Sequence, residues 1–336
     1  MKIAIHKHSK GFGKRWVAYC EENHIPYKIV DCYQSDIIGQ LEDCDALMWH
    51  FYHNDYRDML FARQLLWSLQ TAGKRVFPDY NTCWHFDDKV GQKYLLEAIG
   101  APLVPSHVFY TKDEAIEWIE KTEFPKVFKL RGGAGAENVK LVKSKKEAIR
   151  LANKAFERGF SKFNRLGYLK ERIRKYKEGK DTISGVLKGV ARIFIPTTLA
   201  RMSSNEKGYI YFQDFVPDNS YDIRIIVVAG KAFAIKRMTR KNDFRASGSG
   251  NIVYAKDQMD ERCVKIAFEV NEKIKSQSIA YDFVFDKKNN PLLVEISYGF
   301  STSVYDPCEG YWDKNLIWYE GQFNPYGWMV EMLINE

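Results

Sequence analysis

Apolar and polar positions alternate along the first 85 residues in a pattern that predicts a parallel α/β domain. Short apolar runs at residues 2–5, 27–30, 46–49 and 75–77 are separated by helical periodicity, most clearly at 57–70. Strands that alternate with helices in this order form a parallel sheet covered by helices. Ligands of such sheets bind beyond the carboxyl ends of the strands.

The loops after the first and third of these strands are therefore candidates for a substrate pocket. A loop histidine is more often solvated or capping than catalytic, so no single one is assigned a role. The polar side chains in the two loops are His6, His8, Ser9, His50, His53 and Asn54.

The pattern changes at residue 86 and predicts a second lobe. A helix over residues 86–99 ends at Gly100, with Pro102 and Pro105 just beyond, as is typical of helix termination. A strand at 124–130 runs into the sequence RGGAGAENV, and residues 139–142 are its expected hairpin partner. Further helices are predicted at residues 113–120 and 145–158.

The last third of the chain is rich in predicted strands. Residues 279–285 and 292–296 form a hairpin across a polar turn at 287–291, and 261–275 is a helix. Other strands are predicted at residues 209–215, 223–228, 232–238 and 252–254. The tail, rich in Trp and Tyr, is expected to pack back onto the body. We divide the chain into an N-terminal α/β domain (1–85), a central lobe (86–207) and a C-terminal lobe (208–336).

The stretch from residue 160 to 206 is predicted to be an elaboration on the core fold. Its first part, residues 161–180, is dense in lysine and arginine. Such a run is most often a solvated helical face. Its aromatic residues are only Phe163, Tyr168 and Tyr176, and no nucleic-acid-binding module is visible. We therefore expect no nucleic-acid partner.

Composition narrows the class of protein. The chain has 336 residues, 45% of them hydrophobic, and a net charge of +8, so a packed core is expected and a disordered chain is excluded. Six scattered cysteines without a CxxC pair support neither a zinc site nor a disulfide framework. The first segment turns polar after five residues, and no apolar run reaches about 18 to 20 residues. These features predict a cytoplasmic protein without a membrane span.

Phosphate chemistry is first suggested by the strand that leads into the glycine-rich loop. Lys129 and the loop at residues 131–137 offer an ammonium group and several backbone N–H groups to phosphate oxygens. Glycine permits the close approach and unusual φ angles that this needs. The segment is neither a Walker A motif, because no GKS or GKT follows, nor a dinucleotide fingerprint, because a strand follows instead of a helix. An ordinary β-turn is the alternative.

Two carboxylates in the C-terminal hairpin predict a metal site. Asp282 and Glu295 lie on adjacent antiparallel strands, and a turn at residues 287–291 brings them to one face. Both stand inside apolar runs, where an unpaired carboxylate is costly. A divalent cation such as Mg²⁺ would relieve their repulsion, with phosphate oxygens completing its octahedral shell. The alternative is a pair of edge charges that face solvent.

A third segment contains a strand end followed by a group of arginines. Residues 213–216 turn at Pro217, and such a linker is able to present backbone donors and acceptors to a flat base. Arg237, Arg240 and Arg245 come before a Ser/Gly loop, and guanidinium groups suit phosphate and carboxylate. The alternative is a surface loop with ordinary arginines.

In this order, the three segments resemble the ATP-grasp superfamily, most closely its branch of ligases related to the ribosomal-protein S6 glutamate ligases. The resemblance covers residues 80 to 298, and the first 79 residues look like the α/β domain that precedes the fold in this family. It implies a two-lobed fold that clamps ATP together with Mg²⁺, or Mn²⁺ in its place.

The resemblance implies a role for each matching residue. Lys89 resembles the helix lysine that contacts phosphate, and Lys129 the strand lysine that holds the α- and β-phosphates. Asp222 resembles the acid that takes the ribose hydroxyls, and Arg245 the arginine that stabilises the transferring phosphoryl group. The other positions implied to bind nucleotide are Gly132, Gly133, Ala134, Gly135, Gln213, Asp214, Phe215, Val216, Arg237 and Ser247. The implied metal ligands are Asp282, Glu295 and Ser297.

Three departures from the family pattern stand out. Ser297 replaces the usual asparagine, and serine is a poorer Mg²⁺ ligand that acts through water, so a second metal ion is in question. The loop ASGSG replaces the usual pattern of asparagine and glycine, and residues 160–206 have no counterpart in compact members.

The resemblance implies an ADP-forming carboxylate–amine ligase that acts through an acylphosphate, with a small-molecule carboxylate and an amine as substrates. Candidate acceptor positions are the first and third strand loops and residues 247–249 and 301–305. The segments ASGSG and EISYGF and the aromatic tail suggest a polysaccharide or cell-surface precursor. The alternatives are a small-molecule kinase on the same fold and a non-catalytic ATP-binding module. A homodimer is compatible with the sequence, which does not define the oligomeric state.

Overall fold

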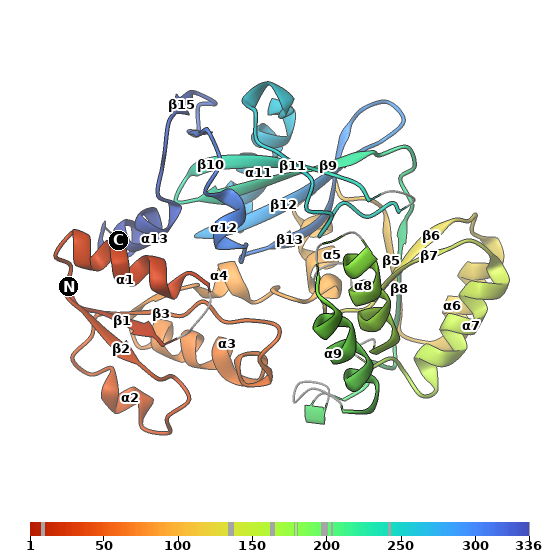
Figure 1. Cartoon of the computed structure of the whole chain (residues 1–336), viewed down its shortest axis with the longest axis horizontal. Helices are drawn as coiled ribbons and strands as arrows, with labels where there is room; N and C mark the ends of the chain where they lie inside the picture. Colours follow the sequence, from red (N-terminus) through yellow and green to blue (C-terminus); the bar gives the residue numbers. More distant parts are fainter. Residues whose placement is uncertain are drawn as a thin grey trace.

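The computed structural model describes residues 1–7, 11–133, 138–161, 165–177, 179, 181–195, 201–202, 204–240 and 243–335. It consists of an N-terminal domain, a central lobe and a C-terminal lobe, shown at the left, right and top of Figure 1. None of the helices in these described ranges is long and apolar enough to cross a membrane.

The N-terminal domain is built on a parallel sheet, as predicted. Its strands follow the order β2-β1-β3-β4, and each neighbouring pair is parallel. Asp55 caps α3, because its carboxylate accepts a hydrogen bond from the Arg57 N–H, and Asp79 caps α4 through the Thr82 N–H. The elements are β1 Ile3–His6, α1 Gly13–Glu22, β2 Tyr27–Val30, α2 Ile37–Gln40, β3 Ala46–Met48, α3 Tyr56–Thr71, β4 Arg75–Phe77 and α4 Tyr80–Cys83.

The central lobe packs α6 and α7 against an antiparallel sheet of order β5-β8-β6-β7. The predicted hairpin of β6 and β7 is present, with Lys129 opposite Val139. Strand β5, which we did not predict, pairs with β8. Strand β8 belongs to this sheet, although our division at residue 207 assigns it to the C-terminal lobe. The elements are α5 Lys89–Ala98, β5 Ser106–Phe109, α6 Lys112–Lys121, β6 Lys126–Lys129, β7 Val139–Val142, α7 Lys145–Phe156 and β8 Ile210–Asp214.

The elaboration that we expected between residues 160 and 206 contains two helices, α8 Arg165–Lys177 and α9 Ile183–Phe194, which lie side by side (Figure 1). Its two ends meet at a β-bridge, in which Phe160 and Glu206 each donate their backbone N–H to the carbonyl of the other, at 2.9 and 2.8 Å. The insertion is therefore closed at its base.

The C-terminal lobe is a second, larger sheet of order β13-β12-β9-β10-β14-β15, with β11 paired to β10. Helix α11 packs on one face through Val264, Ala267 and Val270. The elements are β9 Tyr221–Val228, β10 Lys231–Met238, β11 Ile252–Val253, η1 Lys256–Gln258, α11 Glu261–Ile274, β12 Ser278–Phe285, β13 Pro291–Ser297, α12 Thr302–Tyr305, β14 Gly310–Trp312, β15 Trp318–Glu320 and α13 Pro325–Asn335.

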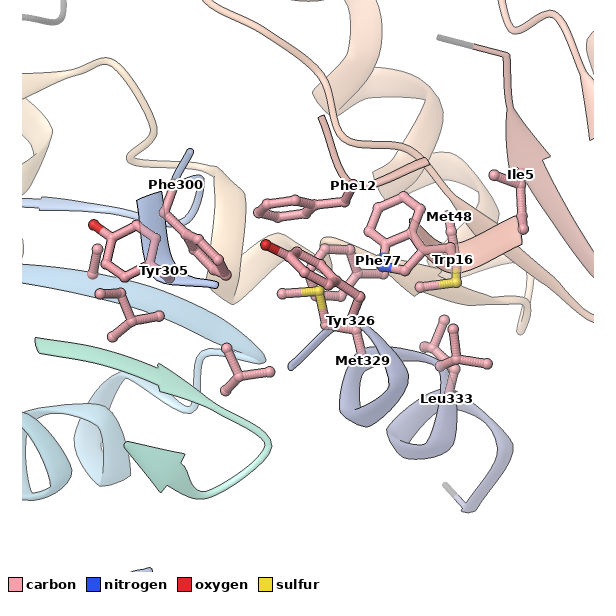
Figure 2. Packing of buried hydrophobic residues seen from close by; sticks show 14 of the residues in the cluster. Ile5, Phe12, Trp16, Met48, Phe77, Phe300, Tyr305, Tyr326, Met329 and Leu333 are labelled. Atoms are coloured by element: carbon pink, nitrogen blue, oxygen red, sulfur yellow. The ribbon is translucent and has the colours of Figure 1, made fainter. Parts of the chain in front are cut away.

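One hydrophobic core joins the N-terminal domain to the C-terminal lobe (Figure 2). The rings of Phe12 and Phe300 lie 4.8 Å apart between centroids, and Phe12 also contacts Tyr326 of α13. Met329 and Leu333 on α13 are fully buried in the same cluster. The tail thus packs back onto the body, as predicted, and it holds the loops of the N-terminal domain beside the end of β13.

Candidate functional site

A cavity of about 910 Å³ is lined by residues of all three parts of the chain. Strands β6 and β8 contribute from the central lobe, β9, β10, β12 and β13 from the C-terminal lobe, and the loop after β3 from the N-terminal domain. The cavity is lined by the following predicted site residues: Lys129, Gln213, Asp214, Phe215, Val216, Asp222, Arg237, Arg245, Ser247, Asp282, Glu295 and Ser297.

Two buried lysines supply positive charge at this site. Lys129 Nζ donates to Gln213 Oε1 at 2.6 Å, and Lys89 Nζ lies 3.1 Å from Glu295 Oε1. Burial lowers the pKa of Lys129 to about 8. Burial also opposes the charge on Lys89, but Glu295 and Asp87 more than offset it, so the pKa of Lys89 is raised. Both lysines are therefore mainly charged at neutral pH, and an anion that enters the site would stabilise the charge on Lys129.

The start of the glycine-rich loop is tied to the N-terminus of α5. The Gly133 N–H donates to Asp87 Oδ1 at 2.6 Å, and Lys89 Nζ donates to the Gly133 carbonyl at 2.7 Å. Gly133 has φ 109°, which favours glycine, and a Cβ on Gly132 would lie 3.1 Å from Asp87 Oδ2. Lys89, Gly132 and Gly133 do not line the cavity themselves. Ala134 and Gly135, also predicted to bind nucleotide, lie outside the described residues.

The two predicted metal-binding carboxylates are direct cross-strand partners, Asp282 on β12 and Glu295 on β13. Arg237 Nη2 lies 3.1 Å from Asp282 Oδ2, and Arg224 Nε lies 3.3 Å from Asp282 Oδ1. Burial tends to raise the pKa of Asp282, but the two arginines outweigh it and lower the pKa. Both carboxylates are thus paired with cations of the protein, although not with the same ones.

The oxygen atoms at this position fit a hard cation whose coordination shell also contains oxygens from outside the protein. Asp282 Oδ1 is buried and accepts no hydrogen bond from the described residues. Ser297 donates its hydroxyl proton to the Gly299 carbonyl at 3.0 Å, so its oxygen lone pairs stay available. Within the described ranges no three His, Cys, Asp or Glu side chains gather as a complete metal site. The protein therefore offers two carboxylates and a hydroxyl, and Mg²⁺ would take its other oxygens from phosphate and water.

Asp222 forms a two-point ion pair across β9 and β10. Arg237 Nε and Nη2 donate to the two carboxylate oxygens of Asp222, each at 2.7 Å. Because Arg237 also contacts Asp282, it connects the position that we predicted for the ribose to the position that we predicted for the metal. Arg237 is 7% exposed, and the two carboxylates raise its pKa despite its burial. The pair is therefore a fixed part of the cavity wall.

The predicted hinge and the predicted catalytic arginine lie on the same side of the cavity. Asp214 is held by Lys126 at 2.7 Å, and the ring of Phe215 packs edge-on against Phe244 at 5.8 Å. Arg245 follows Phe244 and binds both oxygens of Asp243, at 2.9 and 2.6 Å. The Phe215–Phe244 contact thus places Arg245 beside the hinge.

The far end of the cavity is formed by the N-terminal domain and the segment after β13. Gly11, Tyr52, His53, Ser301 and Thr302 line it. Two residues of the loops that we predicted to bind substrate, His8 and Ser9, lie outside the described residues. Asn54 is exposed and is not among the lining residues. His6 is buried in β1, where its Nδ1 accepts a hydrogen bond from the Cys32 N–H.

His50 and His53 have different roles in this wall. His50 Nδ1 accepts from the Phe12 N–H at 3.1 Å and its ring stacks on Phe12 at 3.6 Å, so His50 supports the first loop. His53 lines the cavity near Asp87 and Glu295, and burial lowers its pKa. His53 is thus a buried imidazole within electrostatic range of Asp87 and Glu295.

The sequence analysis missed some lining residues, namely Arg224, Asp87, Tyr52 and Phe244. A signal was present for Arg224, because it stands two residues after Asp222 on one strand and so shares its face. The aromatic tail, by contrast, was wrongly associated with the substrate. None of the described residues after Thr302 lines the cavity, and Trp312 is buried in the core of the C-terminal lobe.

Comparison with known proteins agrees with this architecture. Residues 194–306, about a third of the chain, match the model of the RimK-like ATP-grasp domain. The chain has the ATP-grasp fold. This confirms the resemblance drawn from the sequence, and the matched segment contains the Asp222–Arg237 pair and both carboxylates. No curated protein sequence matches the chain.

Solved structures share the ATP-grasp fold over nearly the whole chain at low sequence identity. A RimK domain protein from Sphaerobacter thermophilus aligns with a TM-score of 0.58 and 12% identity, over 99% of this chain and 100% of that one. A D-alanine–D-alanine ligase from Bacillus anthracis, complexed with ATP, aligns with a TM-score of 0.58 and 14% identity, over 100% and 96%. A D-cycloserine synthetase aligns with a TM-score of 0.61 and 11% identity, over 100% and 99%.

Proposed function

We propose that this protein is an ATP- and Mg²⁺-dependent carboxylate–amine ligase that forms ADP. The observation that carries the proposal is that one cavity collects Lys129, Arg245, Asp282 and Glu295 around the hinge at the end of β8. These groups come from two lobes and from elements far apart in the chain. The D-alanine–D-alanine ligase that shares the fold was solved with ATP, and a biotin carboxylase domain that also shares it was solved with MgADP.

The proposed reaction has two steps. The γ-phosphate of ATP passes to a carboxylate oxygen of the first substrate, which gives an acylphosphate and ADP. The lone pair of an amine then attacks the acyl carbon, phosphate leaves with the C–O bonding electrons, and the nitrogen loses a proton to form the amide. The first step is phosphoryl transfer, which depends mainly on positioning and on neutralising negative charge.

The residues of this chain supply that neutralisation. Lys129 is buried in the cavity wall beside Gln213, and burial lowers its pKa although Glu295 and Asp282 favour its charged form. Lys89 holds Glu295 and the glycine-rich loop together. Arg245 would have to exchange Asp243 for the transferring phosphoryl group. Mg²⁺, bound by Asp282, Glu295 and Ser297, would supply further positive charge to the phosphates.

The carboxylate and amine would occupy the end of the cavity near the N-terminal domain. This end is lined by Tyr52, His53, Ser301 and Thr302, which offer hydrogen bonds to a polar substrate. A uronic acid of a polysaccharide or cell-surface precursor is compatible with such a wall, as we expected from the segments ASGSG and EISYGF. The aromatic tail does not support this choice of substrate, since the described part of the tail is not in the cavity wall.

Release of ADP tests the proposal. The purified chain is incubated with ATP, Mg²⁺ and sets of uronic acids and amines, and ADP is measured with each pair. ADP that forms only when a carboxylate is present supports the ligase. Tight ATP binding without ADP formation for any pair would instead support a non-catalytic ATP-binding module.

Hydroxylamine separates the ligase from a kinase on the same fold. Hydroxylamine converts an acylphosphate to a hydroxamate, whereas a phosphorylated hydroxyl group does not react. A hydroxamate formed with any substrate that is turned over supports the ligase. Turnover without a hydroxamate would support the kinase.

A further inference from the structure

Helix α9 packs with its small residues inward and its large apolar residues outward. Gly185 and Gly189 are buried, and a Cβ on Gly189 would lie 3.0 Å from Leu169 Cδ1 of α8. Ile183, Leu187 and Val190 are 65%, 64% and 42% exposed. Their i, i+4, i+7 spacing places these three side chains in one stripe along the helix. A contiguous exposed apolar stripe on an otherwise folded protein marks a surface for interaction.

The same insertion holds the net charge of the protein. Residues 161–202 contain eleven Lys and Arg against three Asp and Glu, which is a net charge of +8. The whole chain also has a net charge of +8, so the remaining residues carry equal numbers of acidic and basic side chains. On α9 itself, Lys188 and Arg192 are exposed, and their spacing from Ile183 places them on the side of the helix away from the stripe. The occupant of this surface is therefore anionic.

The insertion is also a separate unit of structure. Its ends are joined by the reciprocal backbone hydrogen bonds of Phe160 and Glu206, and Asn205 Nδ2 donates to the Arg158 carbonyl at 3.0 Å. Helices α8 and α9 pack mainly on each other, on the near side of the molecule in Figure 1. The stripe of α9 is thus carried by a helical hairpin with a closed base.

We propose that the α8–α9 hairpin docks on the surface of an anionic phospholipid bilayer. The aliphatic stripe of α9 would enter the boundary between headgroups and acyl chains, while lysines and arginines of the hairpin contact lipid phosphates. A helix with aliphatic residues on one face and basic residues on its polar side is the type that lies in this interface without spanning the bilayer. The stripe contains no Trp, Tyr or Met, which are the residues enriched in protein–protein interfaces.

Vesicle co-sedimentation of the full chain tests this proposal and does not depend on the proposed ligase activity. The probes are vesicles of equal parts phosphatidylglycerol and phosphatidylcholine, and vesicles of phosphatidylcholine alone. We expect the protein to sediment with the first and not with the second, and high salt to weaken the association, because screening reduces the electrostatic part.

Two variants separate the apolar and the charged contributions. Ile183→Ser/Leu187→Ser/Val190→Ser should weaken the vesicle association on the order of tenfold or more, because the buried apolar area is lost. Lys188→Glu/Arg192→Glu should weaken the vesicle association at low salt. At high salt, where the electrostatic part is already screened, this variant should bind like the unmodified chain. Leu60→Ser on α3, where the leucine is 68% exposed, is the matched control and should bind like the unmodified chain.

Three results would overturn the proposal. The first is no association with either vesicle, or equal association with both. The second is retention by single-stranded RNA or an acidic protein column with no binding to anionic vesicles, which would assign the surface to another class of partner. The third is a large fall in the thermal unfolding midpoint of the serine variant, because the stripe would then be packed against the protein itself.

Discussion

Asp282 and Glu295 face each other directly across β12 and β13, yet they are neutralised by different cations of the protein. Glu295 is paired with Lys89, while Asp282 is paired with Arg224 and Arg237. The arrangement holds two carboxylates side by side, each with its own cationic partner, before any ligand enters. A metal ion with nucleotide phosphates would then bind beside carboxylates that are already held in place.

Glu295→Gln and Lys129→Ala should each abolish measurable ADP formation. Each removes a charge from the wall of the cavity, and the loss of one such preorganised group raises a barrier by about 2.7–4 kcal/mol, or on the order of a hundredfold to a thousandfold in rate. ADP release with a productive substrate pair is the measurement. Glu97→Gln, on the outer face of α5 beside Lys93, is the matched control. Turnover of either site variant at the control rate would exclude our assignment.

Arg237→Ala should destabilise the fold as well as the site. It leaves Asp222 and Asp282 without a shared cation in a buried position. Removing one partner of a buried ion pair costs about 3–5 kcal/mol. Chemical denaturation with a two-state fit gives the free energy of unfolding. Arg262→Ala, which removes a surface pair with Asp260, should leave the midpoint unchanged. Equal midpoints for the two variants would show that the pair with Asp222 does not stabilise the fold.

His53→Ala should affect the carboxylate substrate and not the nucleotide. His53 lines the end of the cavity near the N-terminal domain, away from the hinge at Phe215. We expect the KM for the carboxylate substrate to rise about tenfold, since a hydrogen bond to it is lost, with little change in the Kd for ATP. Steady-state kinetics and direct ATP titration measure the two quantities. A weakened ATP affinity with an unchanged KM would place His53 at the nucleotide instead.

His85 should make the protein less stable in mild acid. Its side chain is fully buried, and burial lowers its pKa to about 4, compared with about 6.5 in an unfolded chain. Between these pH values the unfolded state binds a proton that the native state does not. Stability therefore falls as the pH drops from about 6.5 to about 4, by a total of about 3 kcal/mol.

Unfolding free energies measured across this pH range check the His85 prediction. The slope of the unfolding free energy against pH reports the number of protons taken up on unfolding, and this number should be smaller by about one in His85→Leu than in the unmodified chain. His24→Asn, at an exposed position, is the control for the loss of a histidine as such. An identical slope in His85→Leu and the unmodified chain would contradict the prediction.

Much of the fold was predictable because its signals are local. The parallel strands of the N-terminal domain and the β12–β13 hairpin follow from apolar periodicity and turn residues, which act over a few positions. Strand β5 was missed because it is short and depends on its pairing with β8, about a hundred residues later in the chain. Helix α8 lies within the basic run that we interpreted as a solvated helical face, whereas α9 was not predicted, although its apolar residues recur at helical spacing.

The sequence by itself determined the candidate residues for the chemistry, because Lys89, Lys129, Asp282, Glu295 and the hinge near Phe215 are recognisable from their motifs. Only the tertiary structure decided how these residues are paired. That Arg237 joins Asp222 to Asp282, and that Gly133 is held by Asp87, depends on distances between elements far apart in the chain. The same holds for the outward-facing stripe of α9, because periodicity identifies an apolar face but not the side on which a neighbouring helix packs.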